Sequence, residues 1–268
     1  MGKIEFFRFP LFPPASHEVF DSLTQALTGS ELMKGIPYAA PLVVGTAGLP
    51  VGAIHAPAAA RNSEPIAHAL RALLTSDAVG ASAPAAVLEL ACGSGQHANE
   101  LCASLAPLIE SWQPTDKEPS ACASCEAYRL AQPEGSPARA RLLPARVLCV
   151  EDNPWPPHFA NATFDLVLCV NLLHIAPPTA GPAALRGAAG ALRAGGLLCV
   201  YGPFLQNGEP TTPSNAAFNA QLQQMNPAFG LRDIDREVFA PGKALGLAKH
   251  SVISMPANNF LLVLQKEG

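Results

Sequence analysis

The stretch Val87–Ala98, "VLELACGSGQHA", decides how the chain is expected to fold. A short apolar run ends in a turn with two glycines, and helix-forming residues follow. Gly93 and Gly95 allow positive φ angles and let a ligand approach the backbone without meeting a Cβ atom. The helix that follows would point its free N–H groups at the turn. The stretch therefore predicts a strand–turn–helix unit that holds a ligand with a ribose or a phosphate.

The same alternation of strand and helix continues along the chain. Helices are expected from about Pro65 to Leu74, with Asn62 or Ser63 as the cap, and then over residues 98–105, 121–130, 182–192 and 214–225. Strands are expected over residues 87–91, 108–113, 146–150, 164–170, 197–201, 250–254 and 260–264. Strands that alternate with helices indicate a parallel sheet with right-handed crossovers. The short connection between the last two strands requires that they pair antiparallel or lie at an edge.

Composition bounds the class of protein. The chain has 268 residues, 49% of them apolar and 14% charged, which is enough for a sizeable core. The net charge is −4 and no run of Lys or Arg is present, so a dedicated nucleic-acid surface is not expected. Residues 35–60 carry no Asp, Glu, Lys or Arg, but their prolines and glycines would break a membrane-spanning helix. No membrane span and no secretory signal are expected.

The seven cysteines are an odd number, and three of them (Cys149, Cys169 and Cys199) fall in the expected strands. Free thiols in a core are typical of a reducing compartment, so a cytoplasmic location is expected. Cys122 and Cys125 form a single C-x-x-C pair. Without a second pair at zinc spacing, no metal is expected.

Two parts of the chain differ in character. Residues 1–57 form an aromatic and proline-rich extension, in which residues 17–33 could make one amphipathic helix. Residues 58–268 carry the alternating pattern and form the expected domain. Within it, residues 118–145 are rich in Ala, Pro and Arg.

An acid follows the second expected strand. Asp116 lies about 20 residues after Gly95, where a carboxylate can accept both hydroxyls of a ribose. Gly93 to Ala98 also fits the dinucleotide fingerprint G-x-G-x-x-A, so this pattern alone leaves S-adenosylmethionine and a nicotinamide cofactor equally open.

Three further features favour S-adenosylmethionine. Glu89 sits inside the first strand, where its carboxylate can reach the amino group of a methionine moiety. The only tyrosines are Tyr38, Tyr128 and Tyr201, and none belongs to the Tyr-x-x-x-Lys pair of many reductases. The chain ends with two strands joined through "SMPANNF", which is similar to the reversed terminal hairpin of methyltransferases.

Several stretches together resemble class I S-adenosylmethionine-dependent methyltransferases, and more narrowly the family called methyltransferase-like twenty-six. They are "ARNSEPI", "LELACGSGQHA", "WQPTD", "NLLHIAP", "YGPFLQNGEPTTPSNAAFN", "GLRDID" and "MPANNFLLV". The resemblance covers about residues 58–265, except much of residues 118–145, which it implies are an insertion. It implies an α/β, Rossmann-like fold with a seven-stranded, mostly parallel sheet and an antiparallel terminal hairpin. It also implies a pocket for S-adenosyl-L-methionine, but no particular acceptor.

The expected site gathers residues from the ends of successive strands. The candidates for cofactor binding are Glu89, Gly93, Gly95, Asp116, Asp152 and Asn171. His174 and Tyr201 are the candidates for catalysis, as a base or as groups that orient the acceptor. Three of these candidates also have a plainer explanation. Asp152 can be a solvated loop acid, His174 a core histidine, and Tyr201 a buried phenol with one hydrogen bond. His97, at the start of the helix after the glycine turn, is interpreted as structural.

Methyl transfer from S-adenosylmethionine to a small molecule or a protein side chain is therefore the leading hypothesis. Because the sulfonium carbon is already electrophilic, catalysis needs mainly the alignment of the acceptor with the methyl group. The "NPPY"-type tetrapeptide is missing after the fourth strand, which argues against a DNA adenine methylase. The alternatives are a catalytically silent module that binds a partner, and a nicotinamide-dependent reductase. The acceptor and the oligomeric state do not follow from the sequence.

Overall fold

A computed structural model describes residues 43–44, 49–76 and 84–268. Residues 1–42 of the expected extension, including the helix expected over 17–33, lie outside the described residues. The start of the expected domain at residue 58 falls within the described part and inside the first turn of a helix, α2 (Pro57–Leu74).

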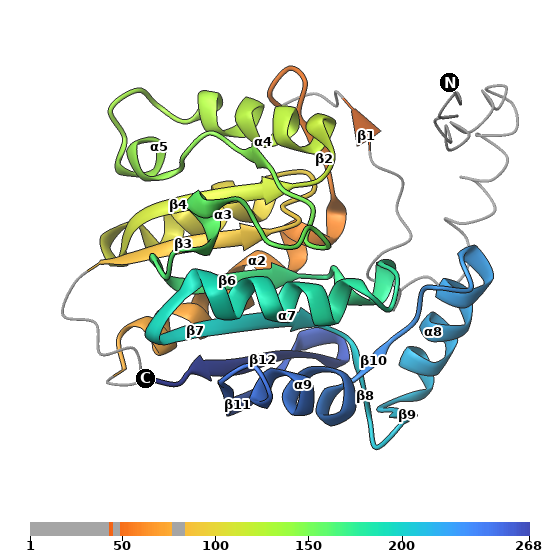
Figure 1. Cartoon of the computed structure of the whole chain (residues 1–268). Helices are drawn as coiled ribbons and strands as arrows, with labels where there is room; N and C mark the ends of the chain where they lie inside the picture. Colours follow the sequence, from red (N-terminus) through yellow and green to blue (C-terminus); the bar gives the residue numbers. More distant parts are fainter. Residues whose placement is uncertain (1–42, 45–48, 77–83) are drawn as a thin grey trace, which may run out of the picture. The chain divides into compact units, whose positions relative to one another are not determined.

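A seven-stranded sheet forms the centre of the described part, in the order β11-β12-β7-β6-β3-β4-β5 (Figure 1). Its strands are β3 (Ala85–Leu90), β4 (Ile109–Asp116), β5 (Arg146–Val147), β6 (Phe164–Val170), β7 (Leu192–Gly202), β11 (Leu247–Met255) and β12 (Asn259–Lys266). All neighbours pair in parallel except that β12 runs antiparallel to both β7 and β11. The expected fold class, a mostly parallel sheet with an antiparallel terminal hairpin, is thus confirmed.

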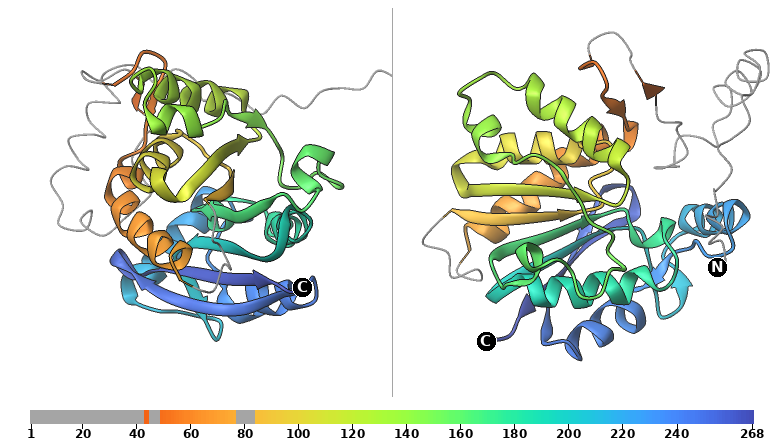
Figure 2. Two further views of the ribbon diagram at one scale, coloured as in Figure 1. Left: turned by 90° about the vertical axis from the view of Figure 1, so that its left-hand side faces the viewer. Right: turned by 45° about the horizontal axis from the view of Figure 1, so that its top comes forward.

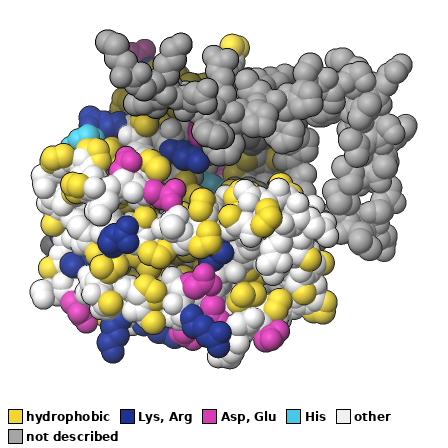
Figure 3. All heavy atoms as spheres, turned by 45° about the vertical axis from the view of Figure 1, so that its right-hand side comes forward, with side chains coloured by type: hydrophobic (Ala, Val, Ile, Leu, Met, Phe, Trp, Pro, Cys, Tyr) yellow, Lys and Arg dark blue, Asp and Glu magenta, His cyan; other side chains and the backbone are white. Residues whose placement is uncertain are grey.

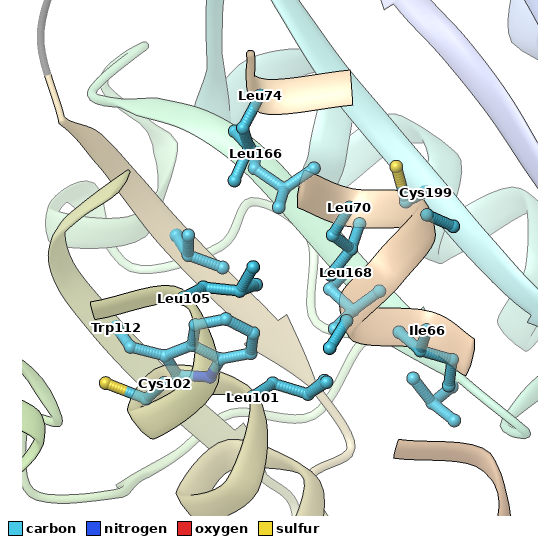
Figure 4. Close-up of a cluster of buried hydrophobic side chains, with 14 of the residues drawn as sticks. Ile66, Leu70, Leu74, Leu101, Cys102, Leu105, Trp112, Leu166, Leu168 and Cys199 are labelled. Atoms are coloured by element: carbon cyan, nitrogen blue, oxygen red, sulfur yellow. The ribbon is translucent and has the colours of Figure 1, made fainter. Parts of the chain in front are cut away.

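Helices cover both faces of this sheet, which explains why every residue of β3 and β6 is buried. On one face, α2 and α3 (Gln96–Leu105) pack against the strands. Figure 4 shows Trp112 of β4 beside the side chains of α3, and Leu70 of α2 near Leu168 of β6. On the other face lie α7 (Ala180–Ala191) and α9 (Ala240–Lys243) (Figure 2).

The helix expected from Pro65 begins eight residues earlier, at Pro57. Pro57 occupies the first turn, where its missing N–H costs nothing. Pro65 lies inside the helix, and burial of Ala59, Ile66 and Leu70 along one stripe outweighs the backbone hydrogen bond that it removes. The prediction that Asn62 or Ser63 caps the helix is therefore wrong, because both residues lie inside it and are buried.

The second strand, expected over residues 108–113, does not stop before Pro114. In a parallel strand, alternate residues direct their backbone groups to the same neighbour. The carbonyl of Trp112 accepts from Leu143 N at 2.9 Å, on the β5 side, whereas the carbonyl of Thr115 accepts from Cys92 N at 2.8 Å, on the β3 side. Pro114 shares the side of Trp112, so no hydrogen bond to β3 is lost and β4 continues to Asp116.

The region expected as an insertion is folded. It contains α4 (Pro119–Ala131), close to the expected helix, and α5 (Pro137–Arg141), which was not among the expected helices. The side chain of Ser136 caps α5 by accepting from Arg139 N at 3.2 Å. The strand expected over 146–150 shrinks to the two exposed residues of β5, because an edge strand pairs on one side only. Cys149 therefore lies outside the strands, while Cys169 and Cys199 lie in β6 and β7.

Expected helices 98–105, 182–192 and 214–225 correspond to α3, α7 and α8 (Pro213–Met225). The strand expected over 197–201 extends backwards through Gly195 to form β7. The smaller elements are β1 (Val43–Val44), β2 (Ile54–His55), α6 (Pro157–Ala160), β8 (Phe204–Gln206), β9 (Glu209–Pro210), β10 (Arg232–Asp233), the 3-10 turns η3 (Ala106–Leu108), η4 (Leu173–Ile175) and η6 (Pro256–Asn258), and the π-helical turn η5 (Ile234–Phe239).

Surface charge and helix length bear on possible partners. Basic and acidic side chains are interspersed on the face that Figure 3 shows. Within residues 43–44, 49–76 and 84–268, none of the helices combines the length and the apolar character that crossing a membrane requires.

Candidate functional site

A cavity of about 410 Å³ lies where β3, β4 and β6 end, at the carboxyl edge of the parallel strands. This is the usual position of a ligand in an open α/β sheet, and the volume suits a small molecule. The residues that line it are Ile54, Ala56, Pro57, Ala58, Ala59, Ala91, Cys92, Gly93, Ser94, His97, Asp116, Glu118, Ser120, Ala121, Val170, Asn171 and Ile175.

Asp116 joins two of the turns around this cavity. Its Oδ2 accepts from the backbone N–H of Gly93 at 2.9 Å, and its Oδ1 accepts from that of Glu118 at 2.9 Å. Gly93 has a φ of +55°, and a Cβ atom added to it would meet nothing within 4 Å. The carboxylate is thus fixed at the cavity wall, and the glycine exposes bare backbone beside it.

Gly95 serves a different purpose from Gly93. It precedes α3 with a φ of +82°, and a Cβ atom there would lie 2.3 Å from the Cα atom of Cys125. Gly95 does not line the cavity. The second glycine of the turn is therefore explained by its close contact with α4.

Two residues other than glycine hold positive φ angles at the ends of neighbouring strands and both line the cavity. Ala91 follows β3 with a φ of +53°, and Asn171 follows β6 with a φ of +58°. Such a conformation is uncommon for residues with a Cβ atom and gathers at functional sites. The backbone N–H of Asn171 donates to the carbonyl of Tyr201 at 2.9 Å, which holds the turn in place.

The residues just before α2, which we call the strap (residues 49–56), form another wall of the cavity through Ile54 and Ala56. Ile54 N donates to Ser124 Oγ at 2.8 Å, and Tyr128 Oη donates to the Ile54 carbonyl at 3.1 Å. Ala56 N donates to Oε1 of Gln96. The sequence analysis placed the strap in the N-terminal extension. The absence of Asp, Glu, Lys and Arg from the strap was the one sequence signal that it lines a cavity.

Glu89 lies outside the set of residues that line the cavity. Its Oε2 accepts from Trp112 Nε1 at 2.7 Å, and the side chain is 1% exposed. Burial raises the pKa of Glu89 to about 8, against the opposing effect of the Trp112 hydrogen bond, and the charge of Asp116 raises it further. The carboxyl group is therefore largely protonated at neutral pH.

His174 is also buried and does not line the cavity, although the next residue, Ile175, does. Burial, and then the charge of Arg232, lower the pKa of His174 to about 3, so the ring is neutral. Arg232 holds the turn itself by donating to the carbonyls of Leu173 at 3.1 Å and Ala176 at 2.8 Å. This contact explains the Arg of the "GLRDID" stretch.

Asn171 and His174 both lie beside the end of β7. A Cβ atom at Gly202 would lie 3.4 Å from Nδ1 of His174 and 3.7 Å from Oδ1 of Asn171. The ring of His174 meets that of Phe218 on α8 edge-on, with 5.7 Å between the ring centroids. His174 therefore packs between the end of β7 and α8.

Tyr201 belongs to a buried polar group on the other face of β7. Burial raises the pKa of Tyr201, and hydrogen bonds with Asn62 and Asn259 oppose that rise. Oδ1 of Asn62 lies 2.6 Å from Nε2 of His97, and His97 lines the cavity. Burial lowers the pKa of His97 to about 4. The sequence did not mark Asn62 and His97 as a pair because 35 positions separate them.

Asp152, the remaining candidate for cofactor binding, does not line the cavity. Asp152 is exposed on the turn after β5, where its N–H donates to the Cys149 carbonyl at 3.1 Å. Trp155 packs on α7, where a Cβ atom at Gly187 would lie 2.1 Å from its ring. Cys122 and Cys125 are buried on α4. Within the described ranges, no three His, Cys, Asp or Glu side chains gather as ligands of a metal ion.

Residues 53–266 match the family described as "Protein of unknown function (DUF938)". The chain belongs to this family. The matched range begins at Ala53, so it includes the second half of the strap as well as the sheet, the glycine turn and Asp116.

Solved structures that resemble the DUF938 chain include proteins named as methyltransferases. An O-methyltransferase family protein from Burkholderia thailandensis is 18% identical, with a TM-score of 0.61, over 79% of this chain and 58% of its own. A putative sarcosine dimethylglycine methyltransferase from Galdieria sulphuraria is 12% identical, with a TM-score of 0.58, over 78% of this chain and 86% of its own. PigF with SAH is 17% identical, with a TM-score of 0.51, over 78% of this chain and 59% of its own. The DUF938 chain thus spans about 58% of the Burkholderia protein and has the methyltransferase fold.

Proposed function

We propose that the DUF938 chain transfers a methyl group from S-adenosyl-L-methionine to a small molecule or a protein side chain. The observation that carries the proposal is the fixed carboxylate of Asp116 beside the bare backbone of Gly93. Each oxygen accepts one backbone N–H and keeps further acceptor capacity, which suits the two hydroxyls of a ribose.

The charge of the cavity favours a sulfonium donor over a nicotinamide dinucleotide. Among the described residues that line it, the charged side chains are the carboxylates of Asp116 and Glu118, with no Lys or Arg. A dinucleotide brings a pyrophosphate with two negative charges, whereas S-adenosylmethionine brings a sulfonium cation. Opposite charges at short range attract, so the cavity suits the cation better.

Asn171 takes the place beside the methyl group in this proposal, because it lines the cavity at the end of β6. His174 and Tyr201 support it from behind. A neutral ring with a pKa of about 3 and a phenol with a raised pKa are poor bases near neutral pH. We therefore assign both to positioning the turn and the acceptor, and the reaction then depends mainly on alignment.

The proposal also assigns roles to Glu89, Gly95 and Asp152. Glu89 supports the glycine turn from within β3, and Gly95 allows α4 to approach that turn. Asp152 supplies a carboxylate near the end of the site where the adenine would lie. The finer family suggested by the sequence, methyltransferase-like twenty-six, remains part of the proposal, as does a domain that spans about residues 58–268.

Calorimetric titration with S-adenosylhomocysteine, the product of the donor, tests the function. The wild-type chain should bind it, and Asp116→Ala should weaken binding about 10- to 100-fold, since hydrogen bonds to a charged group are lost. Glu110→Gln is the matched control, because Glu110 is an exposed acid on the same strand. Thermal melting of each variant shows that it is folded.

Two other results would redirect the assignment. No binding of donor or product at millimolar concentration would favour the silent binding module. Enhanced fluorescence of NADH on binding, with no binding of the methyl donor, would favour the reductase.

A further inference from the structure

A chain of buried polar side chains leads from the cavity to β7. His97 of α3 lines the cavity, and its Nε2 lies 2.6 Å from Oδ1 of Asn62 on α2. Asn62, 9% exposed, also interacts with Tyr201 on β7, where it opposes the rise that burial causes in the pKa of the hydroxyl. Three elements therefore hold the imidazole ring in one orientation.

The contact with Asn62 fixes which ring nitrogen of His97 carries the proton. An amide oxygen only accepts hydrogen bonds, so Nε2 must donate and Nδ1 keeps the lone pair. Burial keeps the ring neutral at physiological pH by lowering its pKa to about 4. Within the described part of the chain, no residue donates to Nδ1. His97, a residue of the cavity wall, thus carries a neutral ring whose Nδ1 can accept a hydrogen bond.

The residues around His97 indicate which end of the donor it would contact. Asp116 is assigned to the ribose, and His97 lies in the first turn of α3 beyond the glycine turn. Ala58 and Ala59 at the start of α2 line the same cavity. Glu89, which the sequence analysis assigned to the amino group, accepts a hydrogen bond from Trp112 and does not line the cavity.

We propose that Nδ1 of His97 accepts a hydrogen bond from the ammonium group of the methionine part of the donor, and that Asn62 is the residue that positions the ring. This inference rests on the proposed function. A lone pair attracts an N–H donor and repels a carboxylate, so the contact selects the ammonium rather than the neighbouring carboxylate.

Three ligands separate this contact from the rest of the site. S-adenosylhomocysteine has the whole amino-acid end, decarboxylated S-adenosylmethionine keeps only the amine, and 5′-methylthioadenosine lacks both groups. His97→Ala should weaken binding of the first two ligands by a similar factor, about 10- to 100-fold. Binding of 5′-methylthioadenosine should change less than twofold. His97→Asn, whose amide oxygen lies near the position of Nδ1, should recover part of the loss.

A matched control is His68→Ala, which removes an exposed histidine of α2. Equal losses for all three ligands, or no loss for any, would overturn the role of His97. Failure of the wild-type chain to bind any of the three would instead refute the proposed function.

Nitrogen NMR of the wild-type protein provides a test that needs no stable His97→Ala variant. The Nδ1 resonance of His97, assigned by its absence in His97→Asn, should show an unprotonated nitrogen in the free protein. It should shift when S-adenosylhomocysteine is added and stay in place with 5′-methylthioadenosine. A protonated Nδ1, or identical shifts with both ligands, would contradict the inference.

Discussion

Glu89 links the stability of the protein to pH. Its pKa of about 8 in the folded state exceeds the ordinary value of 4.5, so the folded chain keeps a proton that the unfolded chain has released. Stability must then fall as pH rises from about 4.5 to 8, by up to about 1.4 kcal/mol per pH unit. Glu89→Gln keeps the acceptor for Trp112 and has no proton to lose.

We therefore expect the advantage of Glu89→Gln over wild type in the free energy of unfolding to grow by about 2 kcal/mol between pH 6.5 and 8. Both proteins contain the same buried histidines, so the contribution of these residues cancels in the difference. Urea unfolding at several pH values measures the difference, with Glu110→Gln as the exposed control. Parallel pH profiles for Glu89→Gln and wild type would mean that the carboxyl group is ionised in the folded protein.

The two glycines of the turn should respond differently to the same substitution. Gly95→Ala brings a Cβ atom against the backbone of Cys125 and should cost about 2–5 kcal/mol of stability. Gly93→Ala meets open space, so it should cost only about 1–2 kcal/mol, the strain of its positive φ, while lowering the affinity for S-adenosylhomocysteine. Urea unfolding and calorimetry distinguish the two effects. Equal losses of stability would contradict the separate roles.

A few side-chain hydrogen bonds hold the strap in place. Ser124 Oγ accepts from Ile54 N and donates to the Ser94 carbonyl at 2.6 Å, so it ties the strap to the glycine turn. Ser124→Ala should speed hydrogen exchange at the Ile54 amide about 10-fold, which corresponds to the loss of about one hydrogen bond. Ser136→Ala, which removes the cap of α5, should leave that amide unchanged. Unaltered protection of Ile54 in Ser124→Ala would show that the strap is held in some other way.

At the level of elements, the sequence predicts the long buried strands and the main helices, because apolar runs and periodic stripes carry them. β6 over 164–170 is an example. It does not predict that Pro114 lies inside β4, since the direction of one backbone N–H depends on which strand lies beside it. It also places Gly93, Asp116 and Asn171 at the cavity through their positions after strands. The strap and the Asn62–His97 pair are formed by tertiary contacts between distant segments, which no local pattern records.

At the scale of the whole molecule, truncation tests at which residue the ligand-binding unit begins. A domain that starts at residue 58 would lack Ile54, Ala56 and Pro57, all of which line the cavity. A chain of residues 43–268 keeps these residues and the pairing of β1 with β2. We expect residues 43–268 to bind S-adenosylhomocysteine as the full chain does, and residues 58–268 to bind it at least 10-fold more weakly. Equal affinities measured by calorimetry would show that the strap contributes nothing to the site.

The central claim is that the cavity at the ends of β3, β4 and β6 holds the nucleoside of a methyl donor. A crystal structure of the full chain with S-adenosylhomocysteine measures this directly. We expect the ribose hydroxyls within hydrogen-bond distance of the Asp116 carboxylate, with the sulfur on the side of Asn171. A ligand bound elsewhere, or a cavity closed by the side chains of the protein while the ligand is in excess, would contradict the account.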